Sequence, residues 1–119
     1  MIARTWKGTT ARDKADAYLD YLHRTGVKSC RETRGNLGVY VLRRLVEDRA
    51  EFLFISLWES LEVIKRFAGP DADRAVYFPE DREFLREMVP CVEHYEVSAV
   101  PARAECRESS FPSLLRGLL

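Results

Sequence analysis

The stretch from residue 52 to residue 69, FLFISLWESLEVIKRFAG, constrains the fold most strongly. Its first half is apolar at nearly every position, which is typical of a strand that is covered on both faces. Its second half has apolar residues at helical spacing, with Ser60 as the expected N-cap and Gly69 as the expected end. The stretch therefore predicts a doubly covered strand that leads directly into an amphipathic helix. A small α+β domain often forms a pocket at such a junction, and we expect Trp58 at its lip.

The rest of the chain predicts alternating elements around this stretch. A helix from residue 10 should end at Gly26, because glycine is common just past a helix C-terminus. The segment 27–34 is alternating but polar, and it indicates an edge or bent segment. A further helix should begin around Pro79 and end at Pro90. The remaining strands are expected at residues 1–7, 38–45 and 92–100.

This order, β-α-β-β-α-(α)-β, predicts an α+β fold: a ferredoxin-like split βαβ sandwich with an antiparallel sheet and helices on one face. The strand at 52–58 is nevertheless apolar on both faces, with Leu53, Ile55 and Leu57 opposite Phe52, Phe54 and Trp58. An open apolar sheet face would favour aggregation. The sequence therefore predicts a homodimer that packs sheet to sheet across a two-fold axis.

Composition limits the classes of partner and location. The 119 residues form one domain and carry 19 basic and 19 acidic residues, so bulk charge indicates no nucleic-acid partner. No signal peptide and no membrane span are expected. Cys30, Cys91 and Cys106 are few and far apart, which favours free thiols in a cytoplasmic protein. No metal cluster is visible in the sequence, and we expect no metal.

Four segments resemble the antibiotic biosynthesis monooxygenase family, within the dimeric α+β barrel proteins. They are MIARTW, WESLEVIKRFAG, AVYFPEDREFL and VEHYEV. The resemblance covers about residues 1–100, so we expect a domain at 1–100 and a C-terminal extension at 101–119. It implies a homodimer whose two sheets form a barrel, with a small cavity between sheet and helices in each subunit.

The resemblance implies two kinds of chemistry. Some relatives oxidise polycyclic phenols to quinones with O2 and no bound cofactor, and others degrade haem. The haem-degrading type uses an Asn, a Trp and a His, and the resemblance implies that the corresponding positions here are Trp6 or its neighbours, Phe67 and Tyr77. The absent iron-holding His argues against haem, and no Soret band is expected with haemin. We expect no cofactor.

His94 is the leading catalytic candidate. It lies mid-strand, on the same face as Glu96 and near Arg4 if the first and last strands pair. A His with a near-neutral pKa could accept a phenolic proton, which makes the substrate electron-rich enough to react with O2. The alternative is a structural His that ties the two strands together, and this alternative is favoured, because single buried polar residues in sheets are usually satisfied partners.

Aromatic residues are the candidates for ligand binding. Trp6, Trp58, Phe67 and Tyr77 could line a cavity for a planar ring, or they could be core residues. Core packing is favoured for Phe67, and the two interpretations are nearly even for Trp58 and Tyr77. Arg4 could face an anionic ligand oxygen, although pairing with Glu96 is favoured. His23 fits a helix C-terminus.

Two hypotheses for function remain open. The first is a cofactor-independent monooxygenase, or related enzyme, acting on a small aromatic or phenolic substrate. The second is a non-catalytic, dimeric module that binds a small ligand or has a stress or regulatory role. Oxygen consumption with an anthrone-like phenol distinguishes them, together with the effect of His94→Ala.

Overall fold

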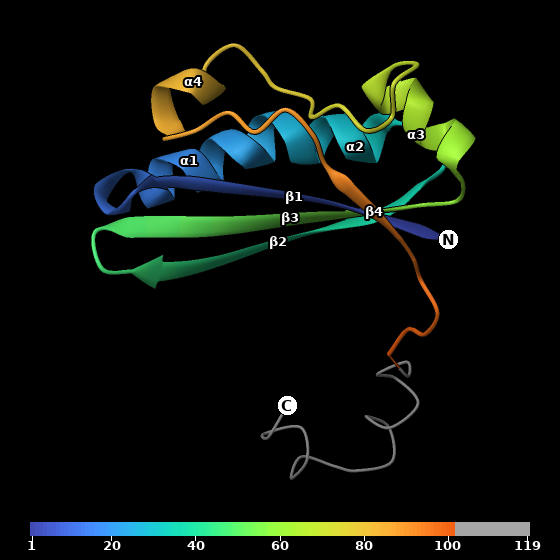
Figure 1. Cartoon of the computed structure of the whole chain (residues 1–119), viewed down its shortest axis with the longest axis horizontal. Coiled ribbons are helices and arrows are strands. Elements are labelled where there is room, and N and C mark those ends of the chain that lie inside the picture. Colours follow the sequence, from blue (N-terminus) through green and yellow to red (C-terminus); the bar gives the residue numbers. More distant parts are fainter. Residues whose placement is uncertain (102–119) are drawn as a thin grey trace, which may run out of the picture.

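The computed structural model describes residues 1–101, and the predicted C-terminal extension lies outside this range except for its first residue. One antiparallel sheet is covered on a single face by helices (Figure 1). The strands are β1 (Ile2–Ala11), β2 (Asn36–Val46), β3 (Arg49–Trp58) and β4 (Glu93–Glu96). The helical segments are η1 (Arg12–Lys14), α1 (Ala15–Leu22), η2 (His23–Val27), α2 (Lys28–Glu32), α3 (Leu61–Ala68) and α4 (Asp81–Phe84).

The sheet has the strand order β2-β3-β1-β4, and all three pairings are antiparallel. This is the arrangement of the predicted ferredoxin-like split βαβ fold, which is confirmed. The strand-to-helix junction is also confirmed, since the Ser60 side chain accepts a hydrogen bond from the backbone N–H of Val63 at the start of α3. Gly69 follows α3 with a positive φ of 93°.

The first helical region is longer than the sequence predicts, because Gly26 does not end it. A five-residue π-helical turn, η2, carries the chain through Gly26 into α2, so the prediction of an edge segment at 27–34 is wrong. Val27 and Cys30 are buried against the sheet, and this burial offsets the roughly 1 kcal/mol that glycine costs inside a helix. No helix within residues 1–101 is long and apolar enough to cross a membrane.

The last helix and the last strand are shorter than predicted. The chain leaves α4 at Leu85, which bridges to Thr10 and becomes buried, while Arg86 donates its backbone N–H to the Thr9 carbonyl. Pairing with the end of β1 therefore replaces the continuation of the helix to Pro90. The strand β4 stops at Glu96, which pairs with Ile2 at the start of β1. Beyond this pair, the Val97 backbone N–H still donates to the Met1 carbonyl (3.0 Å).

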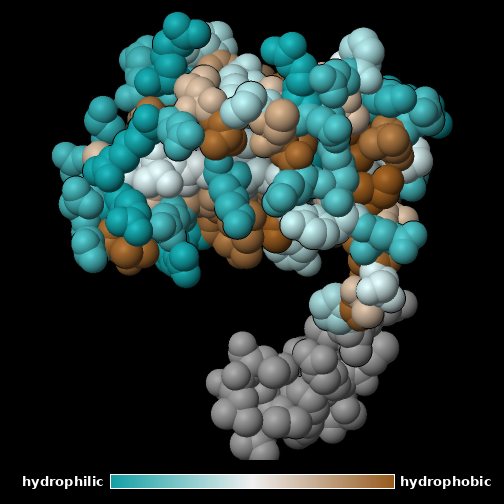
Figure 2. All heavy atoms as spheres, viewed as in Figure 1, coloured by the Kyte–Doolittle hydropathy of each residue, from teal (hydrophilic) through white to brown (hydrophobic). Residues whose placement is uncertain are grey.

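The two faces of β3 have different environments. Residues 50, 52, 54, 56 and 58 are buried beneath the helices, and the alternate residues from 51 to 57 are only half-buried. On that second face, Tyr40 and Leu42 pair in the sheet with Ile55 and Leu53, and Tyr95 pairs with Ala3. The side chains of Tyr40, Leu42 and Tyr95 are exposed. Apolar surface is visible along the side of the sheet away from the helices (Figure 2). We call this surface the open face: Ala3, Thr5, Tyr40, Leu42, Leu53, Ile55, Leu57 and Tyr95.

Candidate functional site

A small, partly open cavity lies between the sheet and the segments above it. Its volume is about 40 Å³, and its walls come from the sheet, from α1 and η2, and from residues 76–81. The segment 76–78, which forms the roof, is half-buried and belongs to no helix or strand. The polar and aromatic residues that define the cavity are Arg4, Trp6, Tyr18, Phe67, Tyr77 and Asp81.

Arg4 supplies a buried positive charge to this cavity. Its side chain is 5% exposed, and one terminal nitrogen donates to the backbone carbonyls of Arg74 (2.5 Å) and Ala72 (3.4 Å). The guanidinium also lies 5.5 Å from the centre of the Phe67 ring. The favoured sequence interpretation paired Arg4 with Glu96, and this is wrong, since the Arg4 guanidinium donates to these two carbonyls and forms no ion pair with Glu96 within residues 1–101. Burial lowers the pKa of Arg4, but an arginine stays charged in proteins.

Asp81 supplies a buried carboxyl group at another part of the wall. It is 3% exposed, and its two oxygens accept hydrogen bonds from the Tyr18 hydroxyl (2.8 Å) and from the Phe78 backbone N–H (2.6 Å). Burial raises the pKa of Asp81, and the two hydrogen bonds only partly oppose this shift. Burial and the neighbouring Asp81 also raise the pKa of Tyr18. A carboxyl group in this setting is a good proton acceptor.

The raised pKa of Asp81 predicts a pH-dependent stability difference from Asp81→Asn. The folded state binds the carboxyl proton more tightly than the unfolded state, so this contribution to stability is present below pH 3.8 and is lost as pH rises through the higher folded pKa. We expect the melting temperature of Asp81→Asn, relative to the unmodified protein, to increase from acid to neutral pH. Thermal melts of both proteins across that range measure it. A constant or decreasing difference would contradict the burial of the charge.

Aromatic side chains hold the roof of the cavity to the sheet. The Trp6 indole N–H donates to the Tyr77 hydroxyl (3.1 Å), which donates in turn to the Val89 carbonyl (2.6 Å). The two rings meet edge to face, with centroids 6.1 Å apart. Trp6, Phe67 and Tyr77, all predicted from the sequence as ligand-binding candidates, therefore lie together around one space.

His94 lies opposite Arg4 in the β1–β4 pairing, as the sequence predicts, but it does not line the cavity. Its Nδ1 lies 3.2 Å from the Asp73 carboxylate, and its Nε2 is buried with no hydrogen-bond partner among the described residues. Burial, followed by the charge of Arg4, lowers the pKa of His94. The imidazole is therefore predominantly neutral near pH 7.

Trp58 lies beside the cavity and not at its lip. It is fully buried, its indole N–H donates to the Ser56 hydroxyl (2.8 Å), and its ring packs 5.6 Å from that of Phe67. It is absent from the residues that line the cavity. This placement favours the core interpretation of Trp58.

Trp58→Phe provides a test of that interpretation. The variant loses the hydrogen bond to Ser56 and some buried volume, so we expect the free energy of unfolding to fall by about 1–3 kcal/mol. Urea denaturation measures this change. Unchanged stability with weakened binding of an aromatic ligand would instead show that Trp58 contacts the ligand.

Sequence reasoning missed Asp81 and Tyr18 as site residues. Asp81 looked like a first-turn acid that favours a helix dipole, and Tyr18 looked like one of several apolar residues on a helix face. They are 63 positions apart, and only the packing of α1 against the start of α4 joins them. A buried polar pair of this kind has no spacing signal in the sequence.

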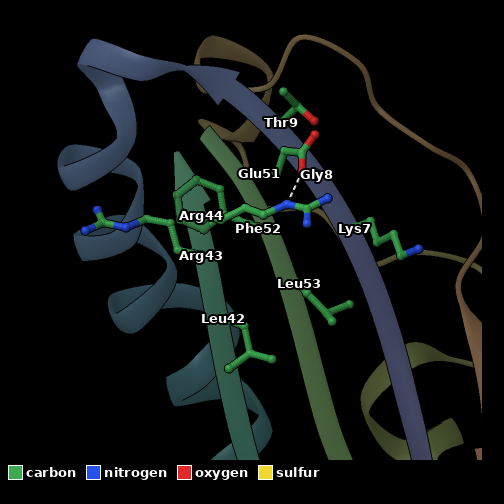
Figure 3. Close-up of a pocket in the computed structure, with 9 residues that line it drawn as sticks. All are labelled: Lys7, Gly8, Thr9, Leu42, Arg43, Arg44, Glu51, Phe52 and Leu53. Carbon is green, nitrogen blue, oxygen red and sulfur yellow. Dashed lines mark hydrogen bonds and ion pairs between the residues drawn. The ribbon is translucent and has the colours of Figure 1, made fainter. Parts of the chain in front are cut away.

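A second, larger hollow lies on the open face. It measures about 520 Å³ and runs between β1, β2 and β3 (Figure 3). Leu42 and Leu53 form its apolar part, and Lys7, Arg44 and Glu51 form its polar part, with Arg44 and Glu51 joined by an ion pair of 2.6 Å. This hollow shares no lining residue with the small cavity between sheet and helices.

Comparisons with known proteins agree with this architecture. The sequence profile described as antibiotic biosynthesis monooxygenase matches residues 1–76. No curated protein matches the chain. A proposed antibiotic biosynthesis monooxygenase from Bacillus cereus has a similar structure, with a TM-score of 0.59 and 20% identity, covering 87% of this chain and 96% of that one.

The haem-degrader MhuD has a similar fold. A mutant of MhuD with two manganese protoporphyrin IX molecules per active site gives a TM-score of 0.55 at 16% identity, covering 87% of this chain and 100% of that one. MhuD from Mycobacterium tuberculosis with two haems bound gives a TM-score of 0.54 at 16% identity, covering 86% and 100%. At these identities the likeness to solved structures concerns the fold, and the sequence profile identifies the family. The chain belongs to the antibiotic biosynthesis monooxygenase family.

Proposed function

We propose that the protein is a cofactor-independent monooxygenase that oxidises a small aromatic or phenolic substrate in the cavity between sheet and helices. The observation that carries this proposal is the buried Asp81 carboxyl group in a cavity lined by aromatic rings. Aromatic walls favour a planar substrate, and a buried base can deprotonate a phenol. Membership of the antibiotic biosynthesis monooxygenase family supports an oxygenase activity for this protein.

The chemistry needs only the substrate, O2 and a proton acceptor. Asp81 accepts the phenolic proton, and the electron-rich phenolate gives one electron to O2. The resulting phenoxyl radical and superoxide combine at a ring carbon, and the proton returns to form a hydroperoxide. Loss of water, with the hydrogen on that carbon leaving as a proton, gives the quinone. One phenol and one O2 thus yield one quinone and one water.

His94 is the second proposed proton acceptor. Its buried, unpartnered Nε2 is the observation in its favour, and its distance from the cavity lining is against it. A transfer to His94 would need the substrate, or a water, to reach past Arg4, its neighbour across the strand pair.

Substrate entry requires the roof to move. A volume of about 40 Å³ accommodates two or three waters or one O2, but not an aromatic ring. The half-buried side chains of Val76, Tyr77 and Phe78 lie on an irregular segment, whose displacement would open the cavity from above. We therefore propose that substrate binding displaces residues 76–78.

Oxygen uptake with dithranol, an anthrone-type phenol, tests the proposed reaction. We expect O2 consumption in a one-to-one ratio with quinone formation, above the rate without protein, and unaffected by a metal chelator. An electrode and absorbance of the product measure the two quantities. Uptake no faster than the uncatalysed rate, with dithranol still bound, would favour the non-catalytic ligand-binding module instead.

The open face supports a proposal about assembly. The side chains of Tyr40, Leu42 and Tyr95 are exposed on this face, and the described residues place no helix over it. We propose a homodimer that packs these two faces together, as the sequence analysis predicts. The hollow of about 520 Å³ would then lie within the dimer interface.

Haem degradation is not proposed. Neither histidine, His23 nor His94, is among the residues that line the cavity. The Tyr77 hydroxyl, where the family resemblance implies an iron-holding His, is occupied by Trp6 and by the Val89 carbonyl. These residues do not fit a haem-binding site.

A further inference from the structure

We propose that the ligand of this cavity is an aromatic acid whose carboxylate binds to Arg4. The inference rests on the proposed function insofar as both use the same cavity, and it adds the charge of the ligand and its orientation. The observation behind it is a buried arginine that, among the described residues, has no ion-pair partner and carries an N–H group without an acceptor.

The contacts of Arg4 leave its charge unbalanced. Within residues 1–101, its side-chain hydrogen bonds reach only the backbone carbonyls of Ala72 and Arg74, and its buried Nε has no acceptor. No carboxylate within residues 1–101 forms an ion pair with it, although seven other ion pairs join arginine or lysine side chains to acids. A buried charge without a partner is costly, whereas a charge-assisted hydrogen bond to a carboxylate is strong.

The groups around Arg4 do not neutralise it. The Asp73 carboxylate is 75% exposed and pairs with His94, so water screens its attraction for Arg4. Burial raises the pKa of the neighbouring Cys30 thiol to about 12, so this thiol is uncharged at neutral pH. His94 carries a second nitrogen without a partner, directly across the strand pair. Among the described residues, these neighbours therefore leave the positive charge of Arg4 and its Nε–H without a buried partner.

The cavity has two polar ends. Arg4 lies opposite Ser56 in the sheet, whereas the Asp81 end lies over Phe52, whose ring is 5.1 Å from that of Tyr18. Phe52 and Ser56 are four positions apart on β3, which corresponds to about 13 Å along a strand. Trp6, on β1, lies between these two ends. A matching ligand has a carboxylate at one end, an aromatic body over Trp6, and a hydroxyl group near Asp81.

Paired acid and amide probes test the inference. 2-Naphthoate and 2-naphthamide have nearly the same shape but differ in charge. We expect the acid to bind the unmodified protein about ten- to a hundredfold more tightly, which is the range for hydrogen bonds to charged groups. In ¹H–¹⁵N spectra of the arginine side chains, the Arg4 Nε–H resonance should shift with the acid and not with the amide.

Variants assign the preference to Arg4. Arg4→Gln should bind acid and amide equally, Arg4→Lys should keep part of the preference, and Arg31→Gln, an exposed arginine in α2, should keep all of it. Calorimetric titration measures these affinities.

Three results would overturn the inference: equal affinity of the unmodified protein for both probes, an unchanged Arg4 Nε–H resonance on binding the acid, or no binding of either probe. Each would mean that Arg4 is satisfied within the protein, for example by a water shared with His94. Oxidation of the neutral dithranol does not depend on Arg4 binding a carboxylate, so that assay can fail or succeed independently.

Discussion

Asp81→Asn should lower the rate of dithranol oxidation about 10²- to 10⁴-fold, the usual contribution of a general base. The variant retains the shape of the side chain, so its amide can still contact Tyr18 and Phe78. The loss should appear in kcat more than in KM, because a proton acceptor acts on the chemical step. Initial rates of O2 uptake across a range of substrate concentrations measure both constants.

Two further variants make this test selective. Asp13→Asn removes an exposed carboxylate that is remote from the cavity lining, and it should leave the rate within about twofold of the unmodified protein, as surface substitutions usually do. His94→Ala addresses the competing proton acceptor. If His94→Ala removes activity at unchanged melting temperature while Asp81→Asn does not, His94 is the base and the assignment to Asp81 is wrong.

Ile55→Glu should convert the proposed homodimer into a folded monomer. Ile55 lies in the middle of the open face, between Thr5 and Tyr40 in the sheet, and a two-fold interface would bury two copies of the new carboxylate. Burying an unpaired charge costs several kcal/mol, so the dimer dissociation constant should rise at least about a hundredfold. Sedimentation equilibrium measures the dissociation constant, and circular dichroism checks the fold.

Two control variants test whether the effect is specific to the interface or follows from placing a glutamate at any apolar position. Met88→Glu changes an exposed methionine next to Val89, whose carbonyl binds the roof residue Tyr77 on the helix side of the sheet, and should leave the dimer intact. Phe54→Glu places the same carboxylate in the core beneath the helices, and should unfold the chain. An unmodified protein that sediments as a monomer, or an Ile55→Glu variant that remains a tight dimer, would refute sheet-to-sheet packing.

The sequence alone determined the fold, because its signals are periodic. Alternation along β3 assigned Ile55 and Phe54 to opposite faces, and the Ser60 and Gly69 signals located both ends of α3. Strand order followed from the succession of elements. Local rules failed at Gly26 and Leu85, where burial against the sheet and pairing with β1 outweighed the ordinary preference for ending or continuing a helix.

The site depended more on tertiary structure. Sequence reasoning named Arg4, Trp6, Phe67 and Tyr77, which do surround one cavity, because their positions on β1 and around α3 follow from periodicity and from the family resemblance. It could not distinguish an Arg4 that binds Glu96 from one whose Nε lacks any acceptor. Nor could it identify Asp81, whose chemistry arises from burial beside Tyr18. Periodicity determines which face a side chain occupies, whereas burial, counter-charges and hydrogen-bond partners come from segments that meet only when the chain folds.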